Sequence, residues 1–180
     1  LIIIFGVFTF FKKNEIKQTL KNLESMRHSR TIILIKDQST KSTFCHQALR
    51  KDGSDQWLVK RVIRDIENTG HMAVTLKGDG EPAMQDFLRA VKEQRNQPAI
   101  IEEPPGNDPQ SNGVAEKSVQ DVMGQVRTLK LGLEYRIGHA LDDNHAIIEW
   151  MIEHAGWLIT HLRVGADGKT AWQRVTGRVC

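Results

Sequence analysis

The stretch Asn107-Asp-Pro-Gln-Ser-Asn-Gly-Val-Ala-Glu-Lys-Ser-Val-Gln120 leads from a turn-rich segment into a helix. Its Pro, Asn, Ser and Gly residues favour a loop, predicted over Glu102 to Gly113, and the apolar spacing that follows favours a helix to about Ile137. The pattern therefore places Glu116 in the first or second turn of that helix. A carboxylate in this position needs a partner if it is to act chemically.

A second acidic turn lies upstream, at Lys77-Gly-Asp-Gly-Glu-Pro82, directly after the strand-like run Met72 to Leu76. Asp79 of this turn is separated from Glu116 by 36 residues. We interpret the rest of the chain as a scaffold that brings these two acids together. The alternative is that they are ordinary turn and helix-start residues, which the helix dipole favours.

The size and composition are those of one globular domain, spanning residues 1–180. The chain is 39% hydrophobic and 26% charged, well outside the range of disordered proteins. Its net charge of +3 permits a polyanionic partner without requiring one. Two cysteines provide neither a disulfide framework nor a zinc site, so we expect a reducing, intracellular compartment.

The apolar opening, Leu1 to Phe11, is too short to span a membrane and has no basic region before it, so we predict a buried strand and no membrane partner. Because the chain starts at Leu1 and not at Met, we expect it to be a segment of a longer polyprotein. Further strands are predicted at Thr31 to Lys36, Ser42 to Leu49, Met72 to Leu76 and Ala99 to Ile101.

The helical segments are predicted from apolar residues that recur three and four positions apart. They are a short helix within Lys12 to Arg30, a helix from Ser54 or Asp55 to Gly70, one from Pro82 to Pro98, the helix that carries Glu116, one from Asp142, Asp143 or Asn144 to Gly165, and a final short helix near Thr170. The resulting order predicts an α/β fold with a five-stranded mixed sheet, in which three antiparallel strands are followed by two that alternate with helices.

With these motifs in place, the chain resembles the catalytic core of a retroviral or retrotransposon integrase, which has a ribonuclease-H-like fold. The resemblance rests on the Asp79-Gly-Glu-Pro turn, on Asn107 to Glu116, and on Thr170-Ala-Trp-Gln-Arg174 with Gly177-Arg178. It covers nearly the whole chain. It implies a polynucleotidyl transferase of a transposable element that processes and joins DNA ends, acts in the nucleus and forms homo-oligomers.

The resemblance also implies three carboxylates that hold two Mg²⁺ or Mn²⁺ ions, with Asp79 and Glu116 as two of the catalytic ligands. The third acid belongs in the middle of the first strand, and the family pattern of Asp, aromatic, any residue, Phe puts Val7 in its place. Asp37, at the end of the second predicted strand, is the only other candidate nearby. Because valine offers no oxygen to a metal, the alternative is a catalytically incomplete or decayed domain that retains nucleic-acid binding or self-association.

Several polar residues near Glu116 are candidates for contacts with DNA. They are Gln110 and Asn112 in the loop, and Lys117, Gln120 and Arg127 on the helix. Such side chains usually contact phosphates, which position the nucleic acid without reading its sequence. They can equally be turn residues and solvated helix surface. The four tryptophans lie on predicted helices, where core or interface positions are expected more than base-stacking platforms.

Overall fold

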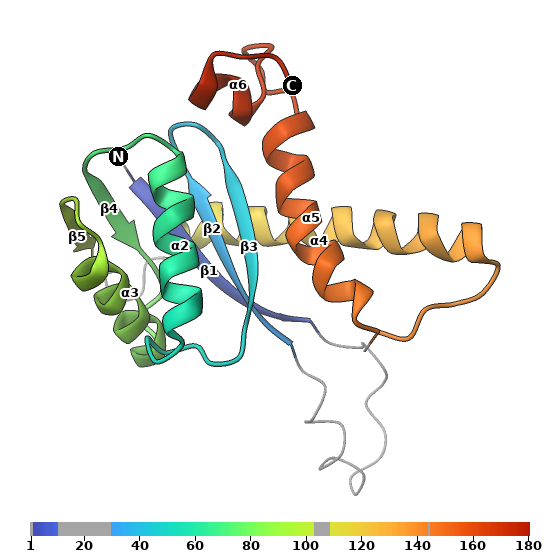
Figure 1. The fold of residues 1–180 in the computed structure, drawn as a ribbon, viewed down its shortest axis with the longest axis horizontal. Coiled ribbons are helices and arrows are strands. Elements are labelled where there is room, and N and C mark those ends of the chain that lie inside the picture. The colour runs from blue at the N-terminus through green and yellow to red at the C-terminus, as the bar shows by residue number, and fades with distance from the viewer. Residues whose placement is uncertain (1, 11–29, 103–108, 144) are drawn as a thin grey trace, which may run out of the picture.

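A computed structural model describes residues 2–10, 30–102, 109–143 and 145–180. Five strands form one sheet in the order β3-β2-β1-β4-β5 (Figure 1). They are β1 (Ile2–Phe10), β2 (Arg30–Asp37), β3 (Thr43–Ala48), β4 (Val74–Lys77) and β5 (Ala99–Glu102). β1, β2 and β3 are antiparallel neighbours, whereas β4 is parallel to β1 and β5. This is the predicted mixed sheet; the helix predicted within residues 12–30 lies almost entirely outside the described residues.

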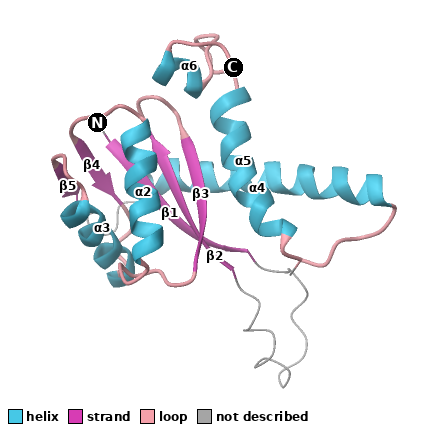
Figure 2. Ribbon diagram, viewed as in Figure 1, coloured by secondary structure: helices cyan, strands magenta, loops and turns pink. Residues whose placement is uncertain are grey.

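Helices cover both faces of the sheet (Figure 2). One face carries α2 (Gln56–Asn68) and α3 (Pro82–Gln94), and the other carries α4 (Pro109–Ile137) and α5 (Ile147–Leu162), after which comes α6 (Ala171–Thr176). Since side chains alternate along a strand, β2 sends Ile33 and Ile35 into the first core and Ile32 and Leu34 into the second. Burial on both faces explains why this strand is an unbroken apolar run.

The helix α2 confirms its prediction closely. The side chain of Asp55 caps its start by accepting the N–H of Leu58 at 3.1 Å. The helix ends before Gly70, which has a φ of 78° that glycine adopts without strain. All five apolar residues of the predicted stripe are buried, namely Leu58, Val59, Val62, Ile63 and Ile66.

The strand β4 starts two residues later than predicted, at Val74. The guanidinium of Arg95 donates to the carbonyl oxygens of His71 at 2.7 Å and of Pro98 at 2.8 Å. These bonds hold the segment before Val74 in a loop, and Met72 is 70% exposed. A contact between residues so far apart in sequence has no signature in a local pattern.

The helix α4 starts earlier than predicted, at Pro109 in place of a residue after Gly113. Proline is well suited to a first helical position, where its missing N–H costs no hydrogen bond. The apolar residues three and four apart on this helix form the expected inward stripe: Val122 and Val126 are fully buried, and Val119, Leu129 and Leu133 are partly buried around them. The far end of α4 projects beyond the sheet (Figure 1). Among the described helices, none is long and apolar enough to cross a membrane.

The helix α5 starts later than predicted, at Ile147. Asp143, a predicted cap residue, pairs instead with Lys130 of α4 and so belongs to the connection between the two helices. The three-and-four spacing of apolar residues in this segment predicts that Leu162 points inward, but its side chain is 56% exposed at the last turn.

The packing of α5 on β3 is unusually close at one point. Thr160 Oγ1 accepts the N–H of Thr43 at 2.9 Å and donates to its carbonyl oxygen at 2.8 Å. A Cβ on Gly156 would lie 3.2 Å from that same oxygen, so a larger residue would force the helix away. Because β3 is an edge strand, these contacts cover backbone groups that would otherwise be open to another chain.

Candidate functional site

Asp79 lies in the turn that follows β4, two residues beyond Lys77. Its Oδ1 accepts the N–H of Glu81 at 3.3 Å, and its backbone carbonyl accepts from Gln85 Nε2 at 2.8 Å. Such side-chain-to-backbone bonds are typical of Asp in turns. The residue is thereby fixed to the start of α3, at the carboxyl end of a parallel strand.

Glu116 lies in the second turn of α4, as predicted, and is exposed. In the part of the chain that the structure describes, its carboxylate has no hydrogen bond or ion pair. The helix crosses β1 next to this residue: a Cβ on Gly6 would lie 3.5 Å from Ala115 Cβ and 3.7 Å from Val119 Cγ2. Gly6 is therefore the position of β1 that faces this turn of α4.

The strand register relates the two acids. Ile4 of β1 is paired with Lys77 of β4 in parallel, and Gly6 and Asp79 each lie two residues further along. Gly6 in turn lies against the helical turn that carries Glu116. The end of β4 that leads to Asp79 and the part of β1 that faces the Glu116 turn therefore lie on the same side of the paired segment.

The residues at this end fit only part of the ligand set that the resemblance implies. Val7 is paired with Ile33, and neither it nor Gly6 contributes an acid. Within the described ranges, no group of three or more His, Cys, Asp or Glu residues is arranged to hold a metal ion. Asp79 and Glu116 are thus two of the three carboxylate ligands that the resemblance implies, and β1 supplies no third.

Asp37 does not complete the site, because it lies at the opposite end of the sheet. It is paired with Ile3 at the start of β1, and its buried carboxylate is already fully engaged. It accepts from the N–H of Ser39 at 2.9 Å, from the N–H and hydroxyl of Thr40, and from His71 Nε2 at 2.8 Å. Asp37 therefore ties the β2–β3 turn to the loop before β4.

This network predicts a pH-dependent stability. Burial raises the pKa of Asp37, but the hydrogen bonds from Thr40, Ser39 and His71 outweigh it and hold the pKa below its ordinary value. We expect Asp37→Asn to lower the free energy of unfolding at pH 7 by about 1–3 kcal/mol, because it weakens a buried charged acceptor. A carboxylate with a lowered pKa contributes its full stabilisation above about pH 4, and this stabilisation is lost as the pH falls through the pKa of the folded state. The free energies of unfolding of the original chain and of Asp37→Asn should therefore converge in acid.

Urea denaturation between pH 3 and pH 7 measures this difference. Asp86→Asn is the matched control, because Asp86 is exposed and, among the described residues, its carboxylate pairs with Arg89 on its own helix. Its effect should stay within about 0.5 kcal/mol. A difference for Asp37→Asn that is the same at every pH would contradict this role of the carboxylate.

The candidate DNA-contacting residues fall into three groups. Gln110 and Asn112 lie within α4 and not in a loop, which corrects their predicted setting. Gln120 and Arg127 are exposed one and three helical turns after Glu116, and so share its face. Lys117 lies on a neighbouring face, where its Nζ is 3.3 Å from Asp121 Oδ1.

A second feature lies at the outer edge of the sheet. Five rings stack along α5 and onto α6, namely Trp150, His154, Trp157, His161 and Trp172; we call them the aromatic ladder. Successive ring centroids are 4.3–5.6 Å apart, with interplanar angles of 7–27°. Trp150 is 55% and Trp157 46% exposed, so of the two expected settings, core or interface, these residues do not occupy the core and an interface position stays a prediction.

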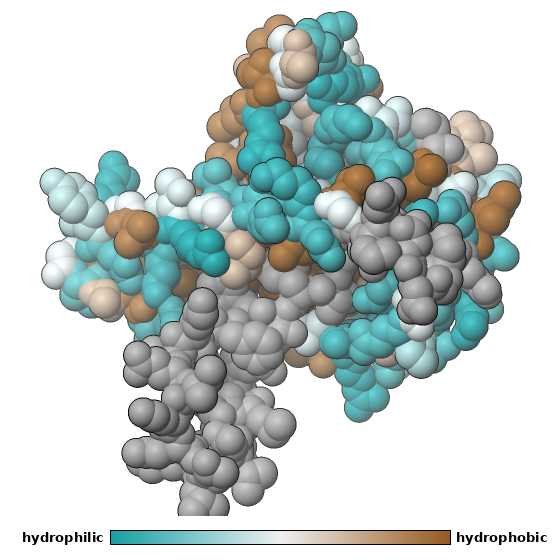
Figure 3. All heavy atoms as spheres, turned by 180° about the vertical axis from the view of Figure 1, so that it is seen from behind, coloured by the Kyte–Doolittle hydropathy of each residue, from teal (hydrophilic) through white to brown (hydrophobic). Residues whose placement is uncertain are grey.

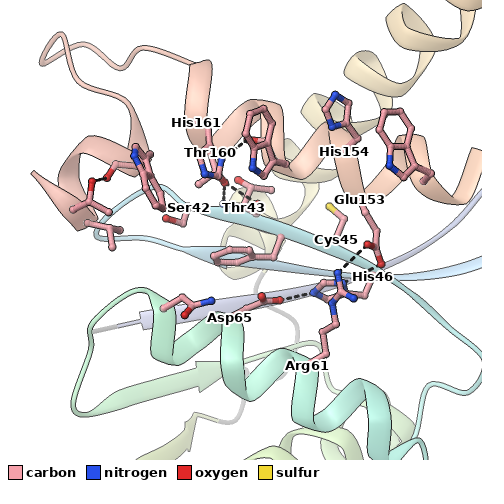
Figure 4. Close-up of a pocket in the computed structure, with 17 residues that line it drawn as sticks. Ser42, Thr43, Cys45, His46, Arg61, Asp65, Glu153, His154, Thr160 and His161 are labelled. Carbon is pink, nitrogen blue, oxygen red and sulfur yellow. Dashed lines mark hydrogen bonds and ion pairs between the residues drawn. The ribbon is translucent and has the colours of Figure 1, made fainter. Parts of the chain in front are cut away.

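The ladder borders a groove of about 640 Å³ between α2, β3 and α5 (Figure 4). On its floor His46 of β3 lies between two carboxylates: Nε2 contacts Asp65 of α2, and Nδ1 is 3.4 Å from Glu153 of α5. Arg61 of α2 donates to the other oxygen of Glu153 at 2.9 Å. We call these four residues the edge network.

The pKa values of His46 and Glu153 are both shifted within the edge network. Burial lowers the pKa of His46, but hydrogen bonds with Asp65 and Glu153 outweigh it and raise the pKa above its ordinary value. The hydrogen bond from His46 holds the pKa of Glu153 below its ordinary value, despite burial. Both shifts therefore favour the charged forms, imidazolium on His46 and carboxylate on Glu153.

Sequence reasoning missed both features. The ladder had a signal, since Trp150, His154, Trp157 and His161 recur four, three and four residues apart on one helical face. The edge network had none, because His46 and Glu153 are 107 residues apart.

Comparison with solved structures shows which known fold this chain shares. Neither a protein-family model nor a curated protein matches the chain. Solved structures do match. A chain of the simian T-cell lymphotropic virus intasome, solved with the PP2A regulatory subunit B56 gamma, is 19% identical with a TM-score of 0.63; the match covers 97% of this chain and 54% of that one, about half its length.

Two isolated integrase cores are similar over most of their length. The HTLV-2 integrase catalytic core, solved with magnesium in a trimeric form, is 14% identical with a TM-score of 0.64, covering 97% of this chain and 95% of that one. The BIV integrase core is 11% identical with a TM-score of 0.55, covering 97% and 93%. These likenesses confirm the predicted ribonuclease-H-like fold of an integrase core.

Proposed function

We propose that the chain is the core domain of a retroelement integrase that binds DNA and belongs to the metal-dependent polynucleotidyl transferases, with a metal site that is incomplete in this copy. The observation that supports the proposal is the register of β1 with β4, in which the strand end before Asp79 and the part of β1 facing the Glu116 turn lie on the same side of the paired segment. The activity proposed for the copy as it stands is negligible.

The chemistry of the two acids supports a role in binding divalent ions. Mg²⁺ prefers carboxylate oxygens, and an HTLV-2 core with this fold was solved with magnesium. A pair of such ions supplies activation of the attacking oxygen and stabilisation of the leaving oxygen in phosphodiester displacement. Asp79 is oriented by its turn and Glu116 is exposed on a helix, and these two residues would hold the ions.

The exposed face of α4 supports DNA binding beside these acids. Gln120 and Arg127 follow Glu116 on that face, and no ion pair among the described residues engages Arg127. A guanidinium in this position would neutralise a phosphate and release a counterion, which makes affinity depend on salt.

We expect Arg127→Ala to weaken DNA binding and to reduce the slope of log K against log salt by about 1, because one phosphate contact is lost. Fluorescence anisotropy with a labelled duplex at several salt concentrations measures the slope. Arg136→Ala is the matched control, since Arg136 is exposed on the opposite face of the same helix. Equal losses in both variants would show that net charge, and not this face, binds the DNA.

The aromatic ladder favours a second role, self-association with another copy of the chain. Two large side chains that line the groove, Trp150 and Trp157, are about half exposed, and aromatic residues are enriched at protein interfaces. The groove carries charges of both signs, which a twofold-related copy complements. The HTLV-2 core was solved in dimeric and trimeric forms. On the face seen in Figure 3, hydrophobic residues form only small separate groups.

A further inference from the structure

The edge network joins two helices that lie on opposite faces of the sheet. Asp65 and Arg61 belong to α2, Glu153 belongs to α5, and His46 lies between them on the edge strand β3. Figure 4 shows the imidazole between the two carboxylates, with the rings of α5 above it. The relative position of α2 and α5, and with it the shape of the groove, therefore depends on these contacts.

The network needs a doubly protonated imidazole. Both ring nitrogens of His46 face carboxylate oxygens, and only imidazolium donates from both nitrogens. After loss of one proton, one carboxylate faces a nitrogen lone pair in a site where His46 is 4% exposed. The contact to Glu153 is the longer of the two, so we expect it to be the one that opens.

We propose that His46 makes the self-association of this chain dependent on pH, because its second proton holds α5, and the aromatic ladder on it, in the position that a second copy recognises. The inference rests on the self-association proposed above and adds its control. The partner is a second copy of the chain, and the regulating ligand is a proton.

The other charged groups around His46 set the direction. Asp65 and Glu153 favour the imidazolium, whereas Arg61 opposes it and at the same time binds Glu153. His154 and His161 of the ladder line the same groove, so the experiment must separate their effects from that of His46.

The sign follows from the raised pKa of His46. Its contribution is fully present below the ordinary histidine pKa of about 6.5 and is lost as the pH rises through the higher folded value. Glu153 has a lowered pKa, so it stays charged throughout this range. Association is therefore tightest near pH 6 and weaker in alkali.

Sedimentation equilibrium at pH 6 and pH 9 tests the inference. For the unmodified chain we expect the dissociation constant to rise about tenfold between these values, as expected for one lost charge-assisted hydrogen bond. His46→Gln should abolish this change, because glutamine does not titrate. His154→Gln and His161→Gln should each keep it, and Trp157→Ala should weaken association at both values. Circular dichroism checks that each variant is folded.

The possible outcomes test self-association and its dependence on pH separately. A dimer whose dissociation constant is the same at pH 6 and pH 9 would overturn the inference and leave self-association intact. The role of His46 is also overturned if the pH dependence survives in His46→Gln but disappears in His154→Gln. A chain that is monomeric at every pH would overturn self-association itself, and the inference with it.

Discussion

A carboxylate introduced into the middle of β1 is expected to raise Mg²⁺-dependent DNA strand transfer at least about 100-fold over the chain as it stands, because a missing metal ligand costs more than the 10–100-fold typical of a lost supporting contact. Two substitutions cover the position. The family pattern selects Val7→Asp, and the close approach of α4 to β1 selects Gly6→Asp. We expect one of the two to recover activity, at least in part.

The matched controls keep the shape and remove the charge. Gly6→Asn and Val7→Asn should remain inactive, and Glu116→Gln in the recovered variant should remove the gain. If neither Asp variant gains activity, or if the gain survives Glu116→Gln, the assignment of Glu116 and of β1 to one metal site is wrong.

Phe87→Ala is expected to lower the free energy of unfolding by about 3–5 kcal/mol. The side chain of Phe87 is fully buried between α3 and the sheet, and its ring meets Phe5 of β1 edge-on, with centroids 6.3 Å apart. Truncation removes this aromatic contact and leaves a cavity that a rigid sheet cannot close. Urea denaturation followed by circular dichroism measures the loss.

Two further variants frame that result. Phe87→Leu keeps most of the volume and should cost clearly less than Phe87→Ala. Tyr135→Ala removes a ring that is 90% exposed on α4 and should change stability by no more than about 0.5 kcal/mol. A loss of less than about 1 kcal/mol for Phe87→Ala would mean that α3 does not pack on the sheet as described.

Much of the fold could be predicted from local patterns. The apolar run of β2 is explained by burial on both faces, and the apolar stripe of α2 by burial on one face. Each pattern repeats over a few neighbouring residues, so it can be recognised in the sequence. The errors lie where distant residues decide a boundary. Arg95 holds the segment before Val74 in a loop, so β4 starts later than predicted. Asp143 pairs with Lys130 and does not cap α5. These long-range contacts have no periodic signal.

Sequence patterns pointed to Asp79 and Glu116 but not to the edge network. Asp79 and Glu116 were chosen from turn and helix patterns, and the register of β1 with β4 supports their placement at one end of the sheet. The edge network could not have been found this way, because its members come from α2, β3 and α5 and meet only after the sheet has formed.

The most direct test of the metal site is a crystal structure of the chain soaked in Mn²⁺, with anomalous scattering used to locate the ion. We expect an anomalous peak within about 2.0–2.6 Å of a carboxylate oxygen of both Asp79 and Glu116, on the side of Gly6. A peak that touches neither carboxylate, or carboxyl groups held too far apart to share an ion, would contradict the proposed metal site.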